Sequence, residues 1–259
     1  MTGPRDSGEG VRVTIVETKG SAPRDAGTAM WVTMAEVSGT IGGGNLEYQA
    51  IEQARKLLAD KGQTSLTQTY ALGPLLEQCC GGSVVLSLEK MSLDAARAIE
   101  REASEVQVRH PLYMFGAGHV GRAVYRALQP LPFSLHWLDE RAEEFLNVSA
   151  GHAIMDHRSD PLDVVENAAA GGLYLIFTHS HALDYEIVKA VLARGDARYC
   201  GLIGSRTKRA RFENRLLRER VVDVAGLEAL TCPIGVPGIT GKEPEVIAAG
   251  VVAQLLQHI

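Results

Sequence analysis

The chain has 259 residues, of which 46% are apolar and 22% charged, a composition that supports one or two domains with substantial cores. The formal net charge of −5 excludes a general electrostatic attraction to nucleic acid or to anionic lipid. The first ten residues are polar and no apolar stretch approaches the length of a membrane span. We therefore expect a cytoplasmic protein that has neither a nucleic-acid nor a membrane partner.

The first 90 residues alternate short strands with glycine-rich turns. Residues 11–18 read VRVTIVET, an alternating β-branched pattern that predicts a strand. Residues 45–62 carry apolar side chains at helical spacing and predict a helix that ends at Gly62. Further strands are predicted over residues 29–34, 39–41, 64–72 and 83–90. Residues 1–91 are therefore expected to form a small α+β domain.

Residues 92–108 form a charged helical stretch, which predicts a helical linker over residues 92–109. Strands and helices then alternate along the chain. Strands are predicted over residues 111–118, 133–139, 152–156, 172–180 and 199–205, and helices over residues 119–128, 160–169, 182–195, 205–220 and 243–257. Apolar strands separated by helices of this length are typical of a parallel sheet covered on both faces. The fold prediction for residues 110–259 is a doubly wound, Rossmann-like α/β domain.

A glycine fingerprint, GAGHVG, follows the first of these apolar strands and opens a helix. Its glycines are Gly116, Gly118 and Gly121, and Asp139 ends the next strand at the spacing of a ribose-binding carboxylate. Glycines let a phosphate approach the backbone, and the helix N-terminus supplies N–H groups. This pattern predicts NAD(P) or another nucleotide, with Arg141 able to favour a 2′-phosphate. The alternative is that the glycines serve helix–sheet packing.

A second motif, THSHALD, follows the strand over residues 172–180. Its His179, His181 and Asp184 are expected at the carboxyl end of a strand beside the fingerprint strand, where ligands bind in doubly wound sheets, with His119 facing them. The H-x-H-x-x-D spacing resembles part of a metallo-hydrolase signature, but it has an extra residue and lacks a third histidine. Ligand hydrogen bonding or helix capping is therefore favoured over a tightly held metal.

The third motif, GLIGSRTKRARF, places cations at the start of a helix. Ser205 is a good N-cap, and it is followed by Arg206, Lys208, Arg209 and Arg211. Positive charge there opposes the helix macrodipole, and a bound anion such as phosphate would compensate for it. The alternative is a solvated basic face.

Four cysteines stand at positions 79, 80, 200 and 232, with no C-x-x-C pair. This spacing does not indicate a disulfide framework or a zinc ribbon. Cys79 and Cys80 precede two glycines, and each is either a ligand thiol or a small packing residue. Cys200 and Cys232 are expected to be packing residues.

Seven stretches together resemble the XdhC/CoxI family of xanthine dehydrogenase accessory proteins. They are ETKGSAPRDAGTAM, GTIGGGNLE, GPLLEQCCGG, FGAGHVGRA, THSHALD, GLIGSRTKRARF and CPIGVPGITGKEPEVIA, in the family's order from Glu17 to about Ala249. The resemblance implies an N-terminal XdhC/CoxI domain followed by a Rossmann-like domain. It also implies a chaperone that binds molybdenum cofactor (molybdopterin), protects it during sulfuration by a cysteine desulfurase, and inserts it into a xanthine dehydrogenase-type apoenzyme of purine catabolism.

The resemblance points to an N-terminal cofactor site. Thr40 to Gly44 would form a nest of backbone N–H donors, and Arg24 would pair with phosphate or dithiolene. The expected cofactor-binding residues are Arg24, Gly42, Gly43, Gly44, Glu47, Cys79 and Cys80. Cys80 matches the family's C-G-G pattern and is the predicted molybdenum ligand, because thiolate is a soft donor. Asn45 and Glu77 depart from the family's pattern, which puts metal ligation by neighbouring residues in doubt.

The favoured hypothesis is a self-associating chaperone rather than a turnover enzyme. An NAD(P)-dependent oxidoreductase is the alternative, supported by the fingerprint and Asp139 but lacking a Tyr-x-x-x-Lys or other hydride-transfer pattern. A metal-dependent hydrolase built on His179, His181 and Asp184 ranks third.

Overall fold

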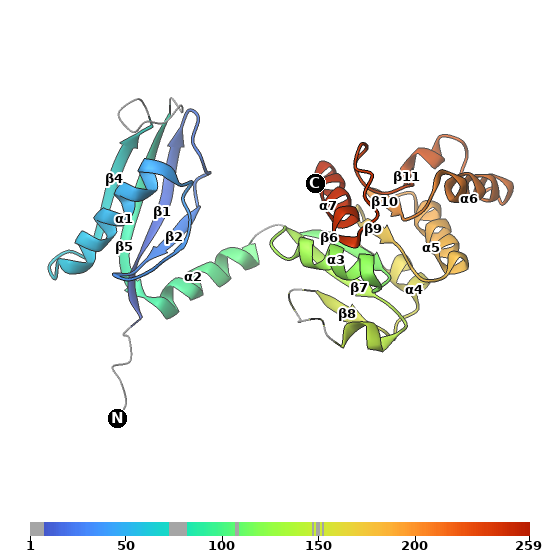
Figure 1. Ribbon diagram of the computed structural model, residues 1–259, viewed down its shortest axis with the longest axis horizontal. Helices are drawn as coiled ribbons and strands as arrows, with labels where there is room; N and C mark the ends of the chain where they lie inside the picture. The colour runs from blue at the N-terminus through green and yellow to red at the C-terminus, as the bar shows by residue number, and fades with distance from the viewer. Residues whose placement is uncertain (1–7, 73–81, 107–108, 147, 149–150, 152) are drawn as a thin grey trace. The chain divides into compact units, whose positions relative to one another are not determined.

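The computed structural model describes residues 8–72, 82–106, 109–146, 148, 151 and 153–259. The chain divides into two compact units, Met1–Gln107 and Val108–Ile259 (Figure 1). The segment that contains Cys79 and Cys80 lies outside the described residues. Within the described ranges, no helix combines the length and the apolar composition that crossing a membrane requires.

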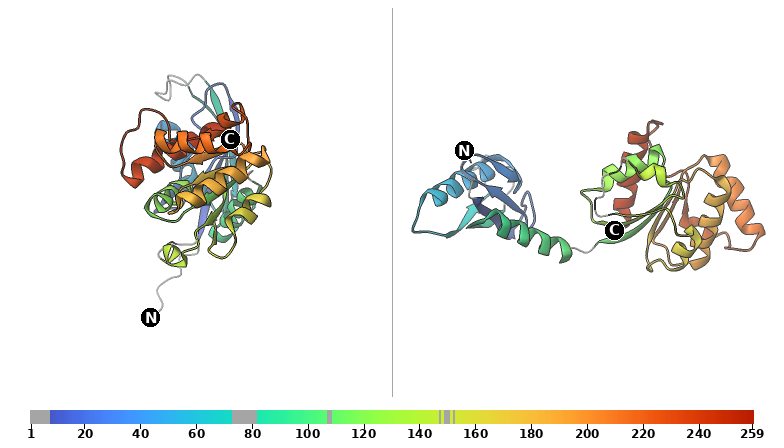
Figure 2. Two further views of the ribbon diagram at one scale, coloured as in Figure 1. Left: turned by 90° about the vertical axis from the view of Figure 1, so that its right-hand side faces the viewer. Right: turned by 90° about the horizontal axis from the view of Figure 1, so that it is seen from below.

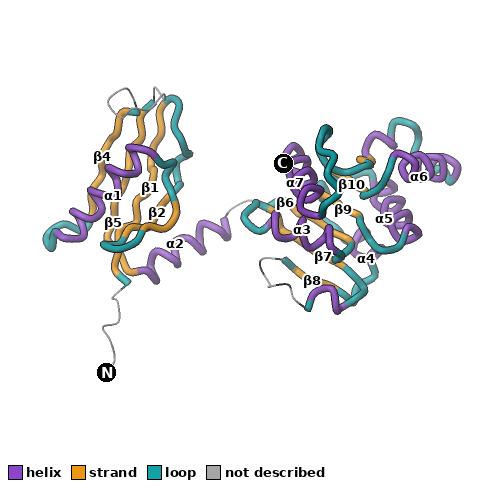
Figure 3. The backbone as a smooth tube through the Cα atoms, in the orientation of Figure 1, coloured by secondary structure: helices purple, strands orange, loops and turns teal. Residues whose placement is uncertain are grey.

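The first unit is a five-stranded antiparallel sheet with a helix packed on it. The strand order is β3 (Val37–Gly39), β2 (Ala29–Val32), β1 (Glu9–Lys19), β5 (Ser83–Ser92) and β4 (Ser65–Ala71). Helix α1 (Gly44–Ala59) lies along this sheet (Figure 3). Its Leu46 and Ala50 join a core with Val11, Val13 and Ile15, which alternate along β1. Helix α2 (Leu93–Val106) follows β5 and contacts β1 and β5.

One predicted strand of this unit is wrong. Strand β3 covers Val37–Gly39, whereas the sequence predicts residues 39–41. Gly39 has a φ of +79°, and the chain leaves the sheet there. The hydroxyl of Thr40 and the N–H of Ile41 both donate to Glu47 instead of joining the sheet. Helix α1 therefore begins in a turn that its own glutamate closes.

The second unit is a six-stranded sheet in which all described pairings are parallel. The order is β11 (Leu230–Thr231), β10 (Tyr199–Leu202), β9 (Leu173–Ile176), β6 (His110–Phe115), β7 (Phe133–Leu138) and β8 (Ile154–Asp156). Strand β9 pairs directly with β6, so the order reverses at the fingerprint strand. The predicted neighbour relation of these two strands is confirmed. In doubly wound sheets, ligands generally bind at the carboxyl ends of strands where the order reverses.

Helices cover both faces of the parallel sheet (Figure 2). Helices α3 (His119–Leu128) and α7 (Pro244–Leu255) contact each other and contribute to one apolar cluster with β6 and β7. Helices α4 (Pro161–Glu166), α5 (His181–Arg194) and α6 (Arg206–Arg218) contribute to a second cluster with β9 and β10. The short 3-10 helices in the described part of the chain are η2 (Ala142–Phe145), η3 (Gly226–Ala229) and η4 (Leu256–His258). The predicted doubly wound α/β fold is confirmed.

Candidate functional site

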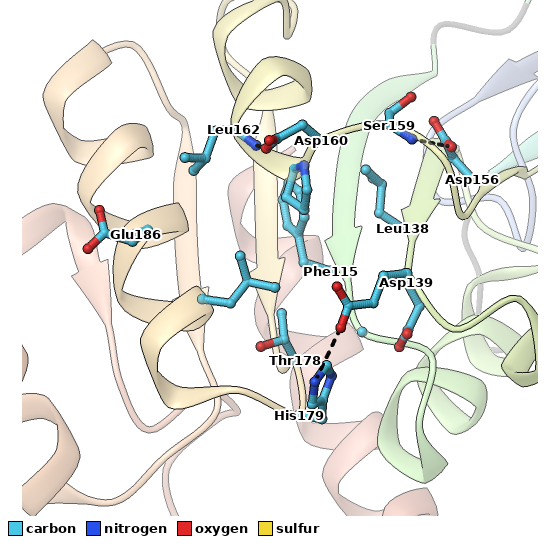
Figure 4. A pocket seen from close by; sticks show the side chains of 14 residues that line it. Phe115, Leu138, Asp139, Asp156, Ser159, Asp160, Leu162, Thr178, His179 and Glu186 are labelled. Carbon is cyan, nitrogen blue, oxygen red and sulfur yellow. Dashed lines mark hydrogen bonds and ion pairs between the residues drawn. The ribbon is translucent and has the colours of Figure 1, made fainter.

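A cavity of about 300 Å³ opens at the carboxyl ends of β6, β7 and β9 (Figure 4). It is lined by Phe115, Gly116, Leu138, Asp139, Glu140, Asp156, Ser159, Asp160, Pro161, Leu162, Thr178, His179, Leu183 and Glu186. Of the residues predicted from the three motifs of this unit, Gly116, Asp139 and His179 line this cavity. The others lie elsewhere along the same edge of the sheet, namely Gly118, His119, Gly121, His181, Asp184, Ser205, Arg206 and Lys208.

The three fingerprint glycines differ in whether their surroundings leave room for a side chain. Gly116 has a φ of +114°, and a Cβ there would lie 2.3 Å from the carbonyl oxygen of Phe177. A Cβ at Gly121 would lie 2.3 Å from the carbonyl oxygen of Gly116. These two glycines are therefore required by close backbone packing. A Cβ at Gly118 would meet nothing within 4 Å, so the fold leaves open space beside the start of α3.

The Asp139 carboxylate is hydrogen-bonded to other groups of the protein. The Asp139 side chain is almost fully buried, and it accepts hydrogen bonds from the N–H of Ala117 at 2.7 Å and from the guanidinium of Arg141 at 2.7 and 2.9 Å. Burial alone would raise the pKa of Asp139, but the Arg141 and Ala117 hydrogen bonds outweigh it and hold the pKa below its usual value. Asp139 thus ties the fingerprint turn to the end of β7. Its predicted contact with a ribose stays a prediction.

Asp184 and Lys208 form a buried ion pair at this edge. The Nζ atom of Lys208 lies 2.6 Å from Asp184 Oδ2 and donates to the carbonyl oxygen of Ile203 at 3.0 Å. The other Asp184 oxygen accepts hydrogen bonds from the N–H and the hydroxyl of Thr178. Asp184 is 1% exposed, so this pair joins the first turns of α5 and α6 inside the protein.

The three motif histidines, His119, His179 and His181, are exposed. His179 Nε2 lies 3.4 Å from Glu140 Oε1, whereas His181 and His119 are the first residues of α5 and α3. Among the described residues, no group of three or more His, Cys, Asp or Glu side chains could hold a metal ion. The hydrolase interpretation of His179, His181 and Asp184 therefore finds no metal-binding geometry in the described structure.

The start of α6 carries less unpaired positive charge than its sequence suggests, because two of its cations form ion pairs. Ser205 caps the helix by accepting the N–H of Lys208 at 3.2 Å, as predicted for an N-cap. Lys208 turns inward to Asp184, and Arg209 pairs with Glu213 at 2.6 Å. Arg206 is exposed on the first turn and remains a candidate for an anionic ligand.

Backbone N–H groups of the predicted nest before α1 donate hydrogen bonds to the Glu47 carboxylate. This carboxylate accepts from the Thr40 hydroxyl and from the N–H groups of Ile41 and Gly43 at 3.0 and 3.1 Å. Burial alone would raise the pKa of Glu47, but these hydrogen bonds outweigh it and lower the pKa. Gly42, Gly43 and Gly44 all have positive φ, which glycine adopts without strain. Glu47 therefore acts as an internal anion in this turn.

Arg24 lies beside the same turn. A Cβ at Gly42 would lie 2.6 Å from Pro23 and 3.6 Å from Arg24 Cγ, and Arg24 is exposed. Gly82, which follows the cysteine segment, packs against the carbonyl oxygens of Lys19 and Ser21. The N–H of Leu72 donates to the carbonyl of Gly82 at 2.7 Å, so both ends of the cysteine segment meet there. One end of the antiparallel sheet thus brings together Arg24, the glycine turn and the two residues that flank the cysteine segment.

The two described cysteines are buried, as predicted for packing residues. Burial raises the pKa of Cys200 to about 12. Burial also raises the pKa of Cys232, although Lys208 and Arg209 oppose it. Both thiols are therefore neutral and unreactive at neutral pH.

Sequence reasoning missed the cavity residues that come from α4, α5 and the residue after Asp139. Glu140 is adjacent to a predicted site residue, Leu183 is the penultimate residue of THSHALD, and Glu186 lies two residues beyond the end of that motif. Helical spacing after that motif is a signal that places Leu183 and Glu186 on one helix face.

Comparison with known proteins gives two family matches. Residues 112–255 match the XdhC Rossmann domain, and residues 5–71 match the XdhC and CoxI family. The uncharacterized protein YqeB of Escherichia coli (strain K12) is 28% identical over 255 residues, which cover 94% of this chain and 42% of that protein. This chain thus spans less than half the length of that curated relative.

A solved structure shares the fold. It is described as a xanthine dehydrogenase from Bacillus halodurans and is 21% identical, with a TM-score of 0.73 over 98% of this chain and 92% of that chain. At this level of identity the similarity concerns the fold.

The different roles of the fingerprint glycines are testable. We expect Gly116→Ala to lower the free energy of unfolding by about 3 kcal/mol, because the new Cβ clashes with the Phe177 carbonyl at a positive φ. Gly118→Ala is the matched control and should change it by less than about 0.5 kcal/mol. Urea unfolding measures both, and equal losses would contradict the packing argument.

The buried ion pair gives a second prediction. Lys208→Met leaves the Asp184 carboxylate buried without its cation, so we expect a loss of about 3–5 kcal/mol in the free energy of unfolding. Lys189→Met removes the Lys189–Glu219 pair, which is more exposed and screened by solvent, and should cost far less. Thermal and urea unfolding of the two variants should show this contrast.

The lowered pKa of Glu47 predicts that the free energy of unfolding depends on pH. The Glu47 pKa is lowered in the folded state, so the ionised carboxylate stabilises the protein above pH 4.5 and this contribution is lost as the pH falls through the folded-state pKa. We expect Glu47→Gln to cost about 1–2 kcal/mol at neutral pH and less at about pH 3. Glu52→Gln, an exposed position on the same helix, is the control. A cost that is constant with pH would contradict the prediction.

Proposed function

Because the chain belongs to the XdhC and CoxI family, we propose that it is an accessory protein that binds molybdenum cofactor. In this proposal it receives the cofactor, keeps it during sulfuration by a cysteine desulfurase, and inserts it into a xanthine dehydrogenase-type apoenzyme. It would act as a self-associating chaperone rather than as a turnover enzyme. The observation that carries the proposal is the gathering of Arg24, the glycine turn and both ends of the cysteine segment at one end of the antiparallel sheet.

The chemistry at that end suits part of the cofactor. Molybdenum cofactor carries a phosphate, a dithiolene and a pterin ring. Arg24 offers an exposed guanidinium, which binds phosphate through paired hydrogen bonds. In the adjacent turn, a Cβ at Gly43 would meet nothing within 4 Å, which leaves space there for a ligand. The cysteine segment, whose flanking residues Leu72 and Gly82 are bonded to each other, carries thiols, which are soft metal ligands. These features support Arg24 and Cys80 as the principal contacts.

The glycine turn itself does not fit a phosphate directly. Its Ile41 and Gly43 N–H groups donate to the Glu47 carboxylate, so an incoming anion would meet a negative charge there. We therefore assign Glu47 to holding the turn in shape, and we assign the anionic end of the cofactor to Arg24. The bound cofactor would supply the molybdenum centre on which the recipient enzyme depends.

The oxidoreductase alternative receives less support from the geometry. Both Asp139 oxygens accept hydrogen bonds from Ala117 and Arg141, so its contact with a nucleotide ribose would require breaking or sharing these bonds. The cavity beside it is lined by several further carboxylates, which disfavour a pyrophosphate.

The proposal is tested by anaerobic titration of the purified apo-protein with freshly released molybdenum cofactor, followed by absorbance and by co-elution. We expect saturable binding that Arg24→Ala and Cys80→Ala each weaken about tenfold or more, because each removes a charged or metal-directed contact. Arg97→Ala, at an exposed position on α2, should bind like the parent. Absence of binding, or binding that neither variant changes, would overturn the proposed site.

A second readout addresses delivery. The loaded protein should activate a xanthine dehydrogenase-type apoenzyme faster than an equal amount of free cofactor does. Equal rates would show that the chain stores the cofactor without inserting it, and would overturn the chaperone role.

A further inference from the structure

The cavity of the second unit has apolar walls and an acidic lining. Its walls include Phe115, Leu138, Leu162 and Leu183. Its titratable lining residues are Asp139, Glu140, Asp156, Asp160, His179 and Glu186. Five carboxylates and one imidazole therefore surround a space that is open to solvent. A phosphate group in this cavity would be repelled by most of the charges that face it.

Three of the five carboxylates accept hydrogen bonds from the protein itself. Asp139 holds Ala117 and Arg141, as described above. Asp156 accepts the N–H groups of Arg158 and Ser159 at 2.9 and 3.1 Å. Asp160 caps α4 by accepting the N–H of Leu162 at 2.8 Å. The hydrogen bonds of these three acids keep the loops around the cavity in place.

The other two carboxylates stand at the mouth of the cavity. The Glu140 side chain is 67% exposed and lies 3.4 Å from His179, and the Glu186 side chain is 43% exposed and lies 3.5 Å from Arg215. Figure 4 shows Glu186 and His179 on different sides of Phe115, one of the residues that line the cavity. Each carboxylate retains acceptor capacity, because an ionised carboxylate has two oxygens and about four lone-pair sites.

Apolar walls with carboxylate acceptors at the rim favour a flat ring that presents N–H groups. A carboxylate pairs best with two adjacent, parallel N–H donors. A 2-amino-4-oxopyrimidine edge offers such a pair, an exocyclic amino group beside a ring N–H, and it occurs in both pterin and guanine. The adenine edge places its amino group beside a ring nitrogen that is an acceptor, which a carboxylate repels. The volume of about 300 Å³ is at the small end of ligand pockets and suits one bicyclic ring rather than a dinucleotide.

We propose that this cavity binds a bicyclic ring with a 2-amino-4-oxopyrimidine edge, a pterin or a guanine, through Glu140 or Glu186. The anionic tail of such a ligand lies outside the cavity, where Gly118 leaves open space at the N-terminus of α3. The proposal rests on the proposed function only in making pterin, the ring of molybdenum cofactor, one of the two sources.

The test is calorimetric titration of the full chain with two matched pairs of small molecules, pterin with lumazine and guanosine with inosine, and with adenosine and NADH for comparison. Lumazine is pterin with an oxo group in place of the 2-amino group, and inosine is guanosine without it. We expect pterin to bind about tenfold or more tightly than lumazine, or guanosine than inosine, because the amino donor is lost in each second member. The tighter of pterin and guanosine identifies the source of the ring.

Three variants locate the binding. Glu140→Gln and Glu186→Gln replace an acceptor oxygen by an amide donor, and at least one should weaken binding about tenfold. Leu162→Trp fills the cavity and should abolish binding, with circular dichroism as the check on folding. Glu143→Gln, an exposed acid outside the cavity lining, is the matched control and should bind like the parent.

Other outcomes would overturn the proposal. They are binding of adenosine or NADH in preference to both pterin and guanosine, equal binding within each matched pair, or binding that Leu162→Trp leaves unchanged. Its failure is distinguishable from failure of the proposed function. If cofactor binds and depends on Arg24 while no ring binds the cavity, only the present inference fails. If pterin binds the cavity while cofactor is not delivered, only the proposed function fails.

Discussion

The carboxyl edge of the parallel sheet depends on one close backbone approach, between the end of β6 at Gly116 and the end of β9 at Phe177. No side chain fits at Gly116, and its carbonyl in turn leaves no room for a side chain at Gly121. The Trp137 indole donates to the same carbonyl at 2.9 Å, which anchors β7 to this point. Strands β6 and β9 and the start of α3 thus meet through direct backbone contacts, the Trp137 side chain ties β7 to the same point, and the cavity opens beside them.

Charged motif residues stabilise the loops around this point. Burying a carboxylate is unfavourable unless hydrogen bonds or a cation compensate for the lost hydration. Asp139 and Asp184 meet that requirement through Arg141 and Lys208. In the separate antiparallel unit, Glu47 meets the same requirement through backbone N–H groups. A motif residue that looks like a ligand contact in the sequence can therefore serve to shape a turn. The partly exposed acids are therefore better candidates for ligand contacts than the buried acids.

Most of the fold is predictable from the sequence, because its signals are local and strong. Continuous apolar strands such as LYLI indicate burial on both faces, and β9 is buried at every position. Strand β11 was missed since two residues carry no periodicity, and β3 was misplaced because Glu47 draws Thr40 and Ile41 out of the sheet.

The site was only partly predictable. The motifs indicate which edge of the sheet matters, because parallel strands end at one edge. Which side chains line the cavity depends on side-chain direction and on how α4 and α5 pack. Glu140 and Asp139 are neighbours in sequence, yet one stands at the mouth while the other is bonded inside the protein. An accessory protein must also release what it binds, and exposed charges form weaker contacts than buried pairs. Rim residues such as Glu140 and Glu186, and the exposed Arg24, are therefore better suited to transient binding than the buried motif acids.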